Sequence, residues 1–420
     1  MSSATASQAA ALPTRRFSVN RLLRLGDGTA RSLVLKQFAR LDQGCLVIEE
    51  GERETCFGDE TSALQARLIV RHPQTWSDMV LGGSIGAGEA WMRGDWDSPD
   101  LAALIALLSR NWQVIEGLDG GLRQLARPFL RGLHWLDRNT REGSRRNISA
   151  HYDLGNDFFA LFLDASMMYS MAIYPRADAS LEEAQFHKLE TLCKKLDLRP
   201  SDHLLEIGSG WGAMAIHAAS RFGCRVTTTT ISQEQFKLAT ERIAAAGLSD
   251  RVTVLLKDYR DLEGSYDKLV SVEMIEAVGH EFLPGYFHHC SRLLKPDGLF
   301  VLQAITIPDQ RYDEARKDVD FIKRYIFPGC TIPSVARMLD CVKSRSDLRL
   351  TGFDEYAEHY ADTLKEWHHR LMRHAADIES RFNPEFLRMW RYYLAYCEGA
   401  FRERRIGCAH LVLAKPGNRS

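Results

Sequence analysis

The second half of the chain alternates short apolar runs with stretches of helical periodicity. Apolar runs of this length predict strands, and apolar positions recurring every three or four residues predict helices. The predicted strands cover 203–207, 224–230, 252–256, 268–272 and 299–305, and the predicted helices begin at 213 or cover 233–245 and 285–294. This alternation predicts an α/β domain with a mostly parallel sheet and helices on both of its faces.

The first half of the chain has a mixed pattern. Residues 1–20 are rich in Ser and Ala and predict a disordered lead, whereas 21–120 predict a small α+β domain with strands at 45–48 and 66–70. Residues 81–96 are dense in glycine and aromatics but lack the hydrophobic pattern of a nucleotide-binding loop, so we expect turns and packing there.

The last hundred residues and the stretch before the first strand of the second half are mainly helical in pattern. Ser180 followed by Glu183 gives a cap signal for a helix over 180–196. Helical patterns recur at 367–375 and 386–404, and the chain closes with a predicted strand over 410–414.

Residues 121–146 interleave arginines with leucine, phenylalanine and tryptophan, with only Asp137 and Glu142 in opposition. A basic amphipathic helix of this kind can lie on an anionic membrane surface with its apolar face in the acyl boundary. The alternative is a linker helix that packs on its own protein. The sequence leaves both open.

Composition narrows the class of protein. A chain of 420 residues with 45% hydrophobic and 26% charged residues is typical of a soluble globular protein with two domains. The net charge of -1 gives no global reason to expect nucleic acid as a partner, so a membrane partner requires a local basic patch. The longest apolar run, 101–108, is too short to span a bilayer, and no secretory signal is visible, which together predict a cytoplasmic protein.

The cysteine pattern favours reduced thiols. Nine cysteines are scattered without a CxxC pair, which argues against a disulfide framework or a zinc site. The histidines are dispersed too, so we expect no metal, and no Ser-His-Asp signature emerges.

The candidate chemistry begins at the end of the strand 203–207. Gly208, Gly210 and Gly212 follow that strand and precede a helix start, where missing Cβ atoms let a ligand approach the backbone. A plain glycine-rich turn is the alternative. In open parallel sheets ligands bind at the carboxyl ends of the strands, where 230–235, 257–260 and 271–279 also lie.

These strand ends favour S-adenosylmethionine over a dinucleotide. The loop reads GxGxG, without the third-glycine spacing of GxGxxG, and the second strand ends in Thr230, where an NAD site favours an acidic residue. A close backbone loop, hydrogen-bonding groups for a ribose and a polar or aromatic group for adenine are all present.

Several stretches together resemble the cyclopropane-fatty-acyl-phospholipid synthase family. They are 151–159, 206–212, 230–235, 258–262, 274–279, 324–329 and 392–401. Residues 83–92 also resemble that family's N-terminal lipid-binding and dimerising domain. The resemblance implies a Rossmann-like class I methyltransferase domain with helical lid insertions over 147–420, a basic amphipathic linker over 121–146, a smaller N-terminal α+β domain and a homodimer.

The strand ends and the resemblance together define a set of expected cofactor-binding residues. They are Tyr152, Glu206, Gly208, Gly210, Trp211, Gly212, Thr230, Ser232, Gln235, Asp258 and Tyr259.

The resemblance implies methylation of the cis double bond of an unsaturated acyl chain in a membrane phospholipid. The alkene takes the sulfonium methyl, and the resulting carbocation loses a proton from that methyl as a cyclopropane ring closes. Such a site must exclude water, and aromatic faces stabilise a cation. The aromatic residues suited to an acyl tunnel, for which core packing is the alternative, are Phe158, Phe159, Phe162, Tyr169, Tyr174, Tyr325, Tyr392 and Tyr393.

The resemblance further implies a bound bicarbonate as the base. Its expected ligands here are Met171, Glu276, Gln303, Ile305 and Tyr360, of which Met171 and Gln303 depart from the family's Cys and His. Gln303 can donate a hydrogen bond but carries no charge, and the Met171 side chain donates none. We expect Glu276 to be catalytic, with a helix-capping role as the alternative. The departures leave a methyl- or methylene-branched product open beside the ring.

Three functions follow from these observations. The first is a lipid C-methyltransferase acting at the anionic inner face of the membrane as a peripheral, cytoplasmic enzyme. The second is methylation of a soluble small molecule, which leaves the basic stretch unused. The third is an inactive lipid-binding protein, which the intact Glu206 and glycine loop disfavour.

Overall fold

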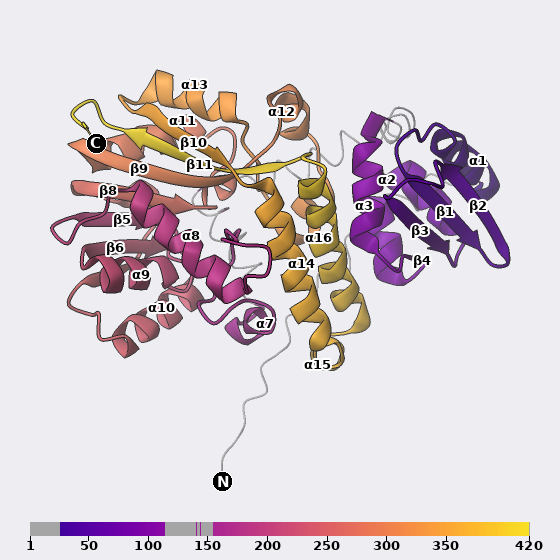
Figure 1. Cartoon of the computed structure of the whole chain (residues 1–420), viewed down its shortest axis with the longest axis horizontal. Coiled ribbons are helices and arrows are strands. Elements are labelled where there is room, and N and C mark those ends of the chain that lie inside the picture. The colour runs from indigo at the N-terminus through magenta and orange to yellow at the C-terminus, as the bar shows by residue number, and fades with distance from the viewer. Residues whose placement is uncertain (1–25, 114–139, 141–142, 144–153, 420) are drawn as a thin grey trace, which may run out of the picture. The chain divides into compact units, whose positions relative to one another are not determined.

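The computed structural model describes residues 26–113, 140, 143 and 154–419 (Figure 1). Contacts divide the chain into two units, the first comprising Met1–Pro128 with Leu371–Tyr396 and the second Phe129–Arg370 with Cys397–Ser420. The predicted lead at 1–20, Tyr152 and, apart from residues 140 and 143, the basic stretch at 121–146 lie outside the described residues. The helical stretch Leu371–Tyr396, which the sequence prediction assigned to the second domain, groups with the first unit.

The first unit contains a small mixed sheet and several helices. Its strands are β1 (Cys45–Glu50), β2 (Arg53–Gly58), β3 (Gln65–Val70) and β4 (Trp96–Asp97), in the order β2-β1-β3-β4. Strand β1 pairs antiparallel with β2 and parallel with β3. Its helices are α1 (Asp27–Phe38), α2 (Gln74–Arg93), α3 (Leu101–Arg110), α15 (Ala375–Arg381) and most of α16 (Pro384–Arg402). The predicted α+β organisation is confirmed.

The prediction of turns at 81–96 is wrong for most of that stretch. Residues up to Arg93 form the second part of α2, and the glycines allow a kink at Gly83, whose φ is 53°. Trp91 is fully buried, and its indole N–H donates to the carbonyl of Arg388 at 2.9 Å. Glycine and alanine positions alternate here with buried tryptophans in a packed helix, so local glycine content was a misleading indicator of turns.

The second unit is an α/β domain, and its remaining elements follow in chain order. They are α7 (Asn156–Ala160), α8 (Leu181–Lys195), β5 (His203–Ile207), α9 (Ala213–Phe222), β6 (Arg225–Thr230), α10 (Gln233–Ala245), β7 (Val252–Leu256), η2 (Tyr259–Asp261), β8 (Tyr266–Val272), η3 (Ile275–Ala277), α11 (Leu283–Leu293), β9 (Leu294–Thr306), α12 (Asp309–Ala315), η4 (Ile322–Ile326), α13 (Val335–Arg345), β10 (Arg349–Glu355), α14 (Ala357–Arg373) and β11 (Gly407–Ala414). The predicted capping box of Ser180 and Glu183 is present at the start of α8.

The strands of the second unit form one seven-stranded sheet in the order β10-β11-β9-β8-β5-β6-β7 (Figure 1). Neighbours from β7 through β9 are parallel, whereas β11 runs antiparallel to both β9 and β10. The chain reverses its winding direction at β5, which lies between β6 and β8. The carboxyl ends of β5 and β8 therefore flank the point where open sheets of this kind bind ligands.

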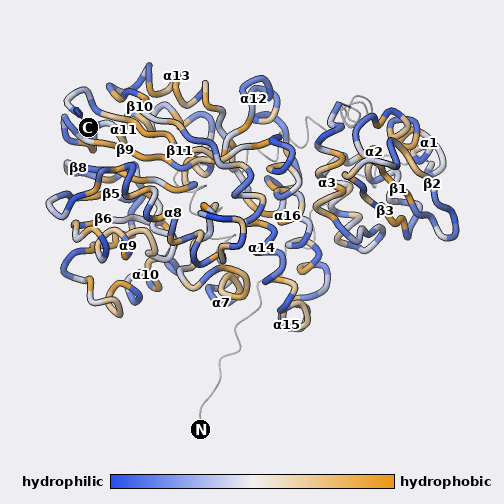
Figure 2. The backbone as a smooth tube through the Cα atoms, viewed as in Figure 1, coloured by the Kyte–Doolittle hydropathy of each residue, from blue (hydrophilic) through white to orange (hydrophobic). Residues whose placement is uncertain are grey.

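Alternating side chains of the central strands fill two cores. Leu205, Leu269 and Phe300 pack on one face with residues of α11 and α13. Their chain neighbours, such as Leu204 and Val270, pack on the other face with residues of α8 and α9. The carboxyl part of β8 and the part of β9 beside it are accordingly hydrophobic (Figure 2), as expected for parallel strands covered on both faces. The predicted mostly parallel sheet with helices on both faces is confirmed.

Helices are inserted among the last strands of this sheet. Elements α12, η4 and α13 lie between β9 and β10 in the chain, and α14 to α16 lie between β10 and β11. Among the described residues, no helix combines the length and the apolar character needed to cross a membrane.

Candidate active site

The glycine loop after β5 has the backbone that its sequence predicts. Gly208, Gly210 and Gly212 all have positive φ, at 98°, 48° and 90°. A Cβ added at Gly208 would meet Met274 at 3.2 Å, and one at Gly212 would meet Ala239 at 3.3 Å, whereas one at Gly210 would meet nothing within 4 Å. The outer glycines thus permit close packing, and Gly210 leaves open space for a ligand to approach the backbone.

The residues after β6 form a tight local network at the same edge of the sheet. Thr230 donates from its hydroxyl to the Gln235 side chain at 2.8 Å and accepts from the Ser232 N–H at 3.1 Å. Ser232 in turn caps α10 by accepting from the Gln235 N–H. All three side chains are buried. This network fixes the turn next to the glycine loop, which Thr229 joins to β6 by accepting at its carbonyl from the N–H groups of Gly208 and Ser209.

Other expected cofactor-binding residues surround the same strand ends. Asp258 follows β7, is buried, and is paired with Arg260 at 2.6 Å. Tyr259 packs edge-on against Tyr286 at 5.4 Å between ring centroids. Trp211 donates from its indole N–H to Asn156 at 2.7 Å. Glu206 is buried, and its Oε2 has no hydrogen-bond partner within the described part of the chain. Burial raises the Glu206 pKa to about 8.

A buried carboxylate, that of Glu273 at the carboxyl end of β8, collects the predicted catalytic residues around itself. Its Oε1 accepts from the Gln303 amide at 2.7 Å and from the backbone N–H of Met171 at 3.0 Å. Its Oε2 accepts from the hydroxyl of Tyr360 at 2.7 Å. Cys408 Sγ lies 3.8 Å from Oε1. Three of the five predicted residues therefore meet at a carboxylate that the prediction did not include.

Met171 contacts Glu273 and Gln303 through its backbone. Its N–H donates to Glu273, and its carbonyl accepts from Gln303 at 3.4 Å. Replacement of the family's cysteine by methionine therefore leaves this contact intact, because the side chain takes no part in it.

The orientation of Gln303 follows from its partners. Its amide nitrogen donates to Glu273, so its oxygen must accept from His410 Nε2 at 2.8 Å. His410 Nδ1 then accepts from Lys195 Nζ at 3.1 Å. Burial and the nearby lysines lower the His410 pKa well below its ordinary value, so the ring is neutral. This series of hydrogen bonds, from Lys195 through His410 to Gln303, fixes the Gln303 amide nitrogen as a donor to Glu273.

Glu276 lies on η3, one turn after β8. Its Oε1 accepts from the backbone N–H of Ile305 at 2.6 Å, and its Oε2 is buried without a partner among the described residues. Its carboxyl group thus contacts strand β9, which is not the helix cap considered as the alternative. Burial, together with the charge of Glu273, raises the Glu276 pKa to about 8. Glu276 is therefore largely protonated at neutral pH, and Glu273, with its several donors, holds the negative charge of the pair.

This protonation has a measurable effect on stability. Because the folded pKa of Glu276 lies above the ordinary carboxyl value, its contribution to the free energy of unfolding falls as pH rises from about 4.5 to about 8. Glu276→Gln removes that contribution. We expect the melting temperature of Glu276→Gln, relative to that of the unmodified protein, to rise from pH 5 to pH 9. Calorimetry measures both temperatures. A difference that does not change with pH would contradict the assignment.

Aromatic rings form a continuous cluster beside the glycine loop. Phe159 lies 5.3 Å from both Trp211 and Tyr169, and Tyr169 lies 5.3 Å from Trp367. Trp367 is 6.3 Å from Tyr360, whose hydroxyl contacts Glu273. Ring faces and edges therefore connect the cofactor loop with the buried carboxylate, a setting that excludes water and favours a cation.

Of the other aromatic residues expected in an acyl tunnel, Phe158 and Phe162 pack on Phe159 in this cluster, at 5.6 and 6.0 Å between ring centroids. The remaining four make other ring contacts. Tyr392 packs on Trp91 at 6.3 Å and Tyr393 on Trp390 at 5.5 Å, all in the first unit. Tyr174 stacks on His359, and Tyr325 packs on Phe321.

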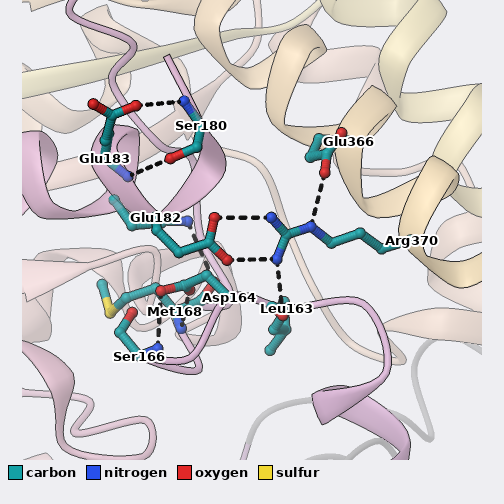
Figure 3. A network of polar contacts seen from close by, with 10 residues as sticks. Leu163, Asp164, Ser166, Met168, Ser180, Glu182, Glu183, Glu366 and Arg370 are labelled. Atoms are coloured by element: carbon teal, nitrogen blue, oxygen red, sulfur yellow. Dashed lines mark hydrogen bonds and ion pairs between the residues drawn. The ribbon is translucent and has the colours of Figure 1, made fainter.

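Arg370 on α14 contacts three segments of the second unit (Figure 3). It makes a bidentate ion pair with Glu182, at 2.8 and 2.9 Å, and donates from Nε to Glu366 at 2.8 Å. It also donates to the carbonyl of Leu163 at 3.4 Å. The start of α8, the loop after α7 and α14 are thereby joined on one guanidinium group.

The strand order, the glycine loop at the switch point and the buried polar groups around it define a class I S-adenosylmethionine-dependent methyltransferase. Within that class, residues 139–411 match the family model described as mycolic acid cyclopropane synthetase. The chain belongs to this family.

Relatives and solved structures agree with that assignment. The chain is 39% identical to tuberculostearic acid methyltransferase UfaA1 of Mycobacterium tuberculosis, over 84% of this chain and 81% of the relative. It is 36% identical to the cyclopropane-fatty-acyl-phospholipid synthase of Escherichia coli, over 83% and 88%. The structure of the mycolic acid cyclopropane synthase CmaA1 complexed with SAH and CTAB superimposes with a TM-score of 0.61, at 30% identity, over 64% of this chain and 98% of that one.

Sequence reasoning missed Glu273 although it examined the stretch that contains it. Glu273 and Glu276 both follow β8, and the resemblance directed attention to Glu276. The available signal was an acidic residue directly after a buried parallel strand, at a strand end already expected to line the site.

Proposed function

We propose that the protein transfers a methyl group to the cis double bond of an unsaturated acyl chain in a membrane phospholipid and closes a cyclopropane ring. The observation that carries this proposal is the buried Glu273 carboxylate joined to the glycine loop by an aromatic cluster. Bound S-adenosylmethionine supplies an electrophilic methyl group. The open space and positive φ at Gly210 fit that cofactor.

The protein's own groups suit a carbocation on the substrate. The rings of Phe159, Tyr169 and Trp367 offer faces to a positive charge and exclude water that would trap it. A carboxylate near the cation stabilises it further and can accept the proton that must leave. Methylation of an amine or hydroxyl develops no charged carbon, so it would make no use of ring faces that stabilise a carbocation.

A branched product is the second candidate. It is favoured by the 39% identity to a protein named for tuberculostearic acid, and by Gln303 standing where the family resemblance implies histidine. If a hydride shifts before the proton leaves, the same methylation yields a methylene branch.

Purified protein incubated with S-adenosylmethionine and vesicles of a cis-monounsaturated phospholipid tests the proposal. We expect demethylated cofactor to accumulate, and the fatty esters, identified by mass spectrometry, to gain one CH₂ and lose the olefin. Retained unsaturation would indicate the branched product. Equal turnover with saturated vesicles or without vesicles would contradict a lipid olefin as substrate.

We also propose that the basic stretch at 121–146 binds an anionic membrane surface. Changing Arg131, Arg138 and Arg141 together to Gln is expected to weaken binding to anionic vesicles about 100-fold, because each arginine near such a surface contributes about 1 kcal/mol. Sedimentation with vesicles measures this, and the corresponding triple change to Lys, which retains the charge, is the control. Unchanged binding by the Gln variant would leave only the linker interpretation.

A further inference from the structure

The groups expected to hold a bicarbonate already serve protein carboxylates. The Gln303 amide, the Met171 N–H and the Tyr360 hydroxyl donate to Glu273, and the Ile305 N–H donates to Glu276. A bicarbonate placed here would lose these donors and face the negative charge of Glu273 in a buried site. The residues present therefore do not fit a bound bicarbonate.

The backbone of Glu273 has a strained conformation, which indicates that its side chain has a function. Its φ is 50°, in the left-handed region that favours glycine, and its N–H continues the pairing with β9 by donating to the Gln303 carbonyl at 2.9 Å. A non-glycine residue in this conformation is strained, and such strain persists mainly where the side chain is needed. Glycine would relieve the strain but remove the carboxylate.

The donors around Glu273 leave it basic. They are an amide, a backbone N–H, a hydroxyl and the Cys408 thiol, all neutral. Asp258, in contrast, is paired with an arginine. Burial raises the pKa of Glu273 above its ordinary value, although the amide, backbone and hydroxyl donors and Lys188 oppose the shift. Oε1 accepts three of these hydrogen bonds and Oε2 only one, so Oε2 retains lone-pair capacity.

We propose that Glu273 is the base of the reaction and takes the place that an external anion would hold; this rests on the proposed methylation of an acyl olefin. Oε2 takes a proton from the newly added methyl group of the substrate cation. The electron pair of that C–H bond forms the second ring bond and neutralises the cation. The proton stays on Oε2 and passes to water after the lipid leaves. Tyr360 and Gln303 are positioning residues for this carboxylate.

Chemical rescue tests the proposal. In buffer freed of carbon dioxide, we expect the unmodified protein to keep full activity, and Glu273→Gly and Glu273→Gln to lose about a thousandfold in turnover, within the usual range for a general base. Sodium bicarbonate or formate should restore Glu273→Gly at least tenfold, because glycine leaves both space and the donors free. Glu273→Gln should not respond, because its amide fills the same space. Asp197→Gly, at another acidic residue with positive φ (46°) and a half-exposed side chain, is the matched control and should behave as the unmodified protein.

A binding measurement separates this proposal from the proposed function. Carbon-13 bicarbonate should bind to Glu273→Gly, detected by NMR, and not to the unmodified protein or to Glu273→Gln. Activity of the unmodified protein that requires bicarbonate, or full activity of Glu273→Gln, would overturn the role of Glu273. Absence of any lipid methylation by the unmodified protein would instead overturn the proposed function. Bicarbonate that binds to Glu273→Gly but not to the unmodified protein would still show that the Glu273 carboxylate occupies an anion site.

Discussion

Gly210→Val is expected to weaken the binding of S-adenosylmethionine about 100-fold, equivalent to about 2.8 kcal/mol. A side chain at Gly210 meets no protein atom within 4 Å, so its bulk would extend into the space where the cofactor approaches the backbone. The loss should therefore be one of affinity, and isothermal titration calorimetry with S-adenosylmethionine measures it directly.

Gly247→Val is the matched control for this change. Gly247 also has positive φ, at 68°, and open space around its missing Cβ. It lies between α10 and the amino end of β7, at the opposite edge of the parallel sheet from the glycine loop. Both variants incur similar backbone strain, but only Gly210→Val should lose cofactor affinity. Equal affinities of the two variants would show that the loop does not contact the cofactor.

Tyr360→Phe is expected to lower kcat at least tenfold and to move the acid limb of the pH dependence of kcat/KM upward by about one to two units. The hydroxyl donates to Glu273 Oε2 at 2.7 Å, and a hydrogen bond to a charged group contributes about 1.5–3 kcal/mol. Its loss raises the pKa of the base, so a higher pH is needed to ionise it. The ring still stacks on Phe401 at 4.3 Å in the variant, which preserves the packing.

The shift in pH dependence distinguishes positioning of the base from a general structural effect. Tyr266→Phe is the control. Tyr266 begins β8, at the opposite end of that strand from Glu273, and its hydroxyl donates to the Glu263 carbonyl at 3.1 Å. This control should leave the acid limb in place. A Tyr360→Phe variant with reduced activity and an unmoved acid limb would contradict an interaction with the catalytic base.

Most of the fold was predictable because local pattern and tertiary environment agree in the second unit. The helix Gln233–Ala245 and the strand Val252–Leu256 have the predicted bounds, since Ser232 caps the helix and the strand pairs along its whole length with β6. Helix α2 was missed because burial of Trp76 and Trp91 outweighs the low helix propensity of its glycines. The grouping of Leu371–Tyr396 with the first unit depends on contacts distant in sequence, such as that between Trp91 and Arg388.

Most residues of the candidate site were predictable from the sequence, but the Glu273 carboxylate that they surround was not. The glycine loop follows from spacing, and motif resemblance selected Gln303, Ile305 and Tyr360 from distant parts of the chain. What these residues donate to depends on side-chain geometry that no spacing encodes. The sequence prediction placed an external anion among these residues, whereas in the structure Gln303 and Tyr360 donate to Glu273. Ile305 donates to Glu276.

The fate of a labelled methyl group tests most directly whether a methyl added to an acyl olefin then loses a proton. The protein is supplied with S-adenosylmethionine bearing a CD₃ group and with vesicles of a cis-monounsaturated phospholipid, and the fatty esters are analysed by mass spectrometry. We expect the acyl chain to retain two of the three deuterium atoms. Retention of all three, or label absent from the lipid, would contradict this expectation.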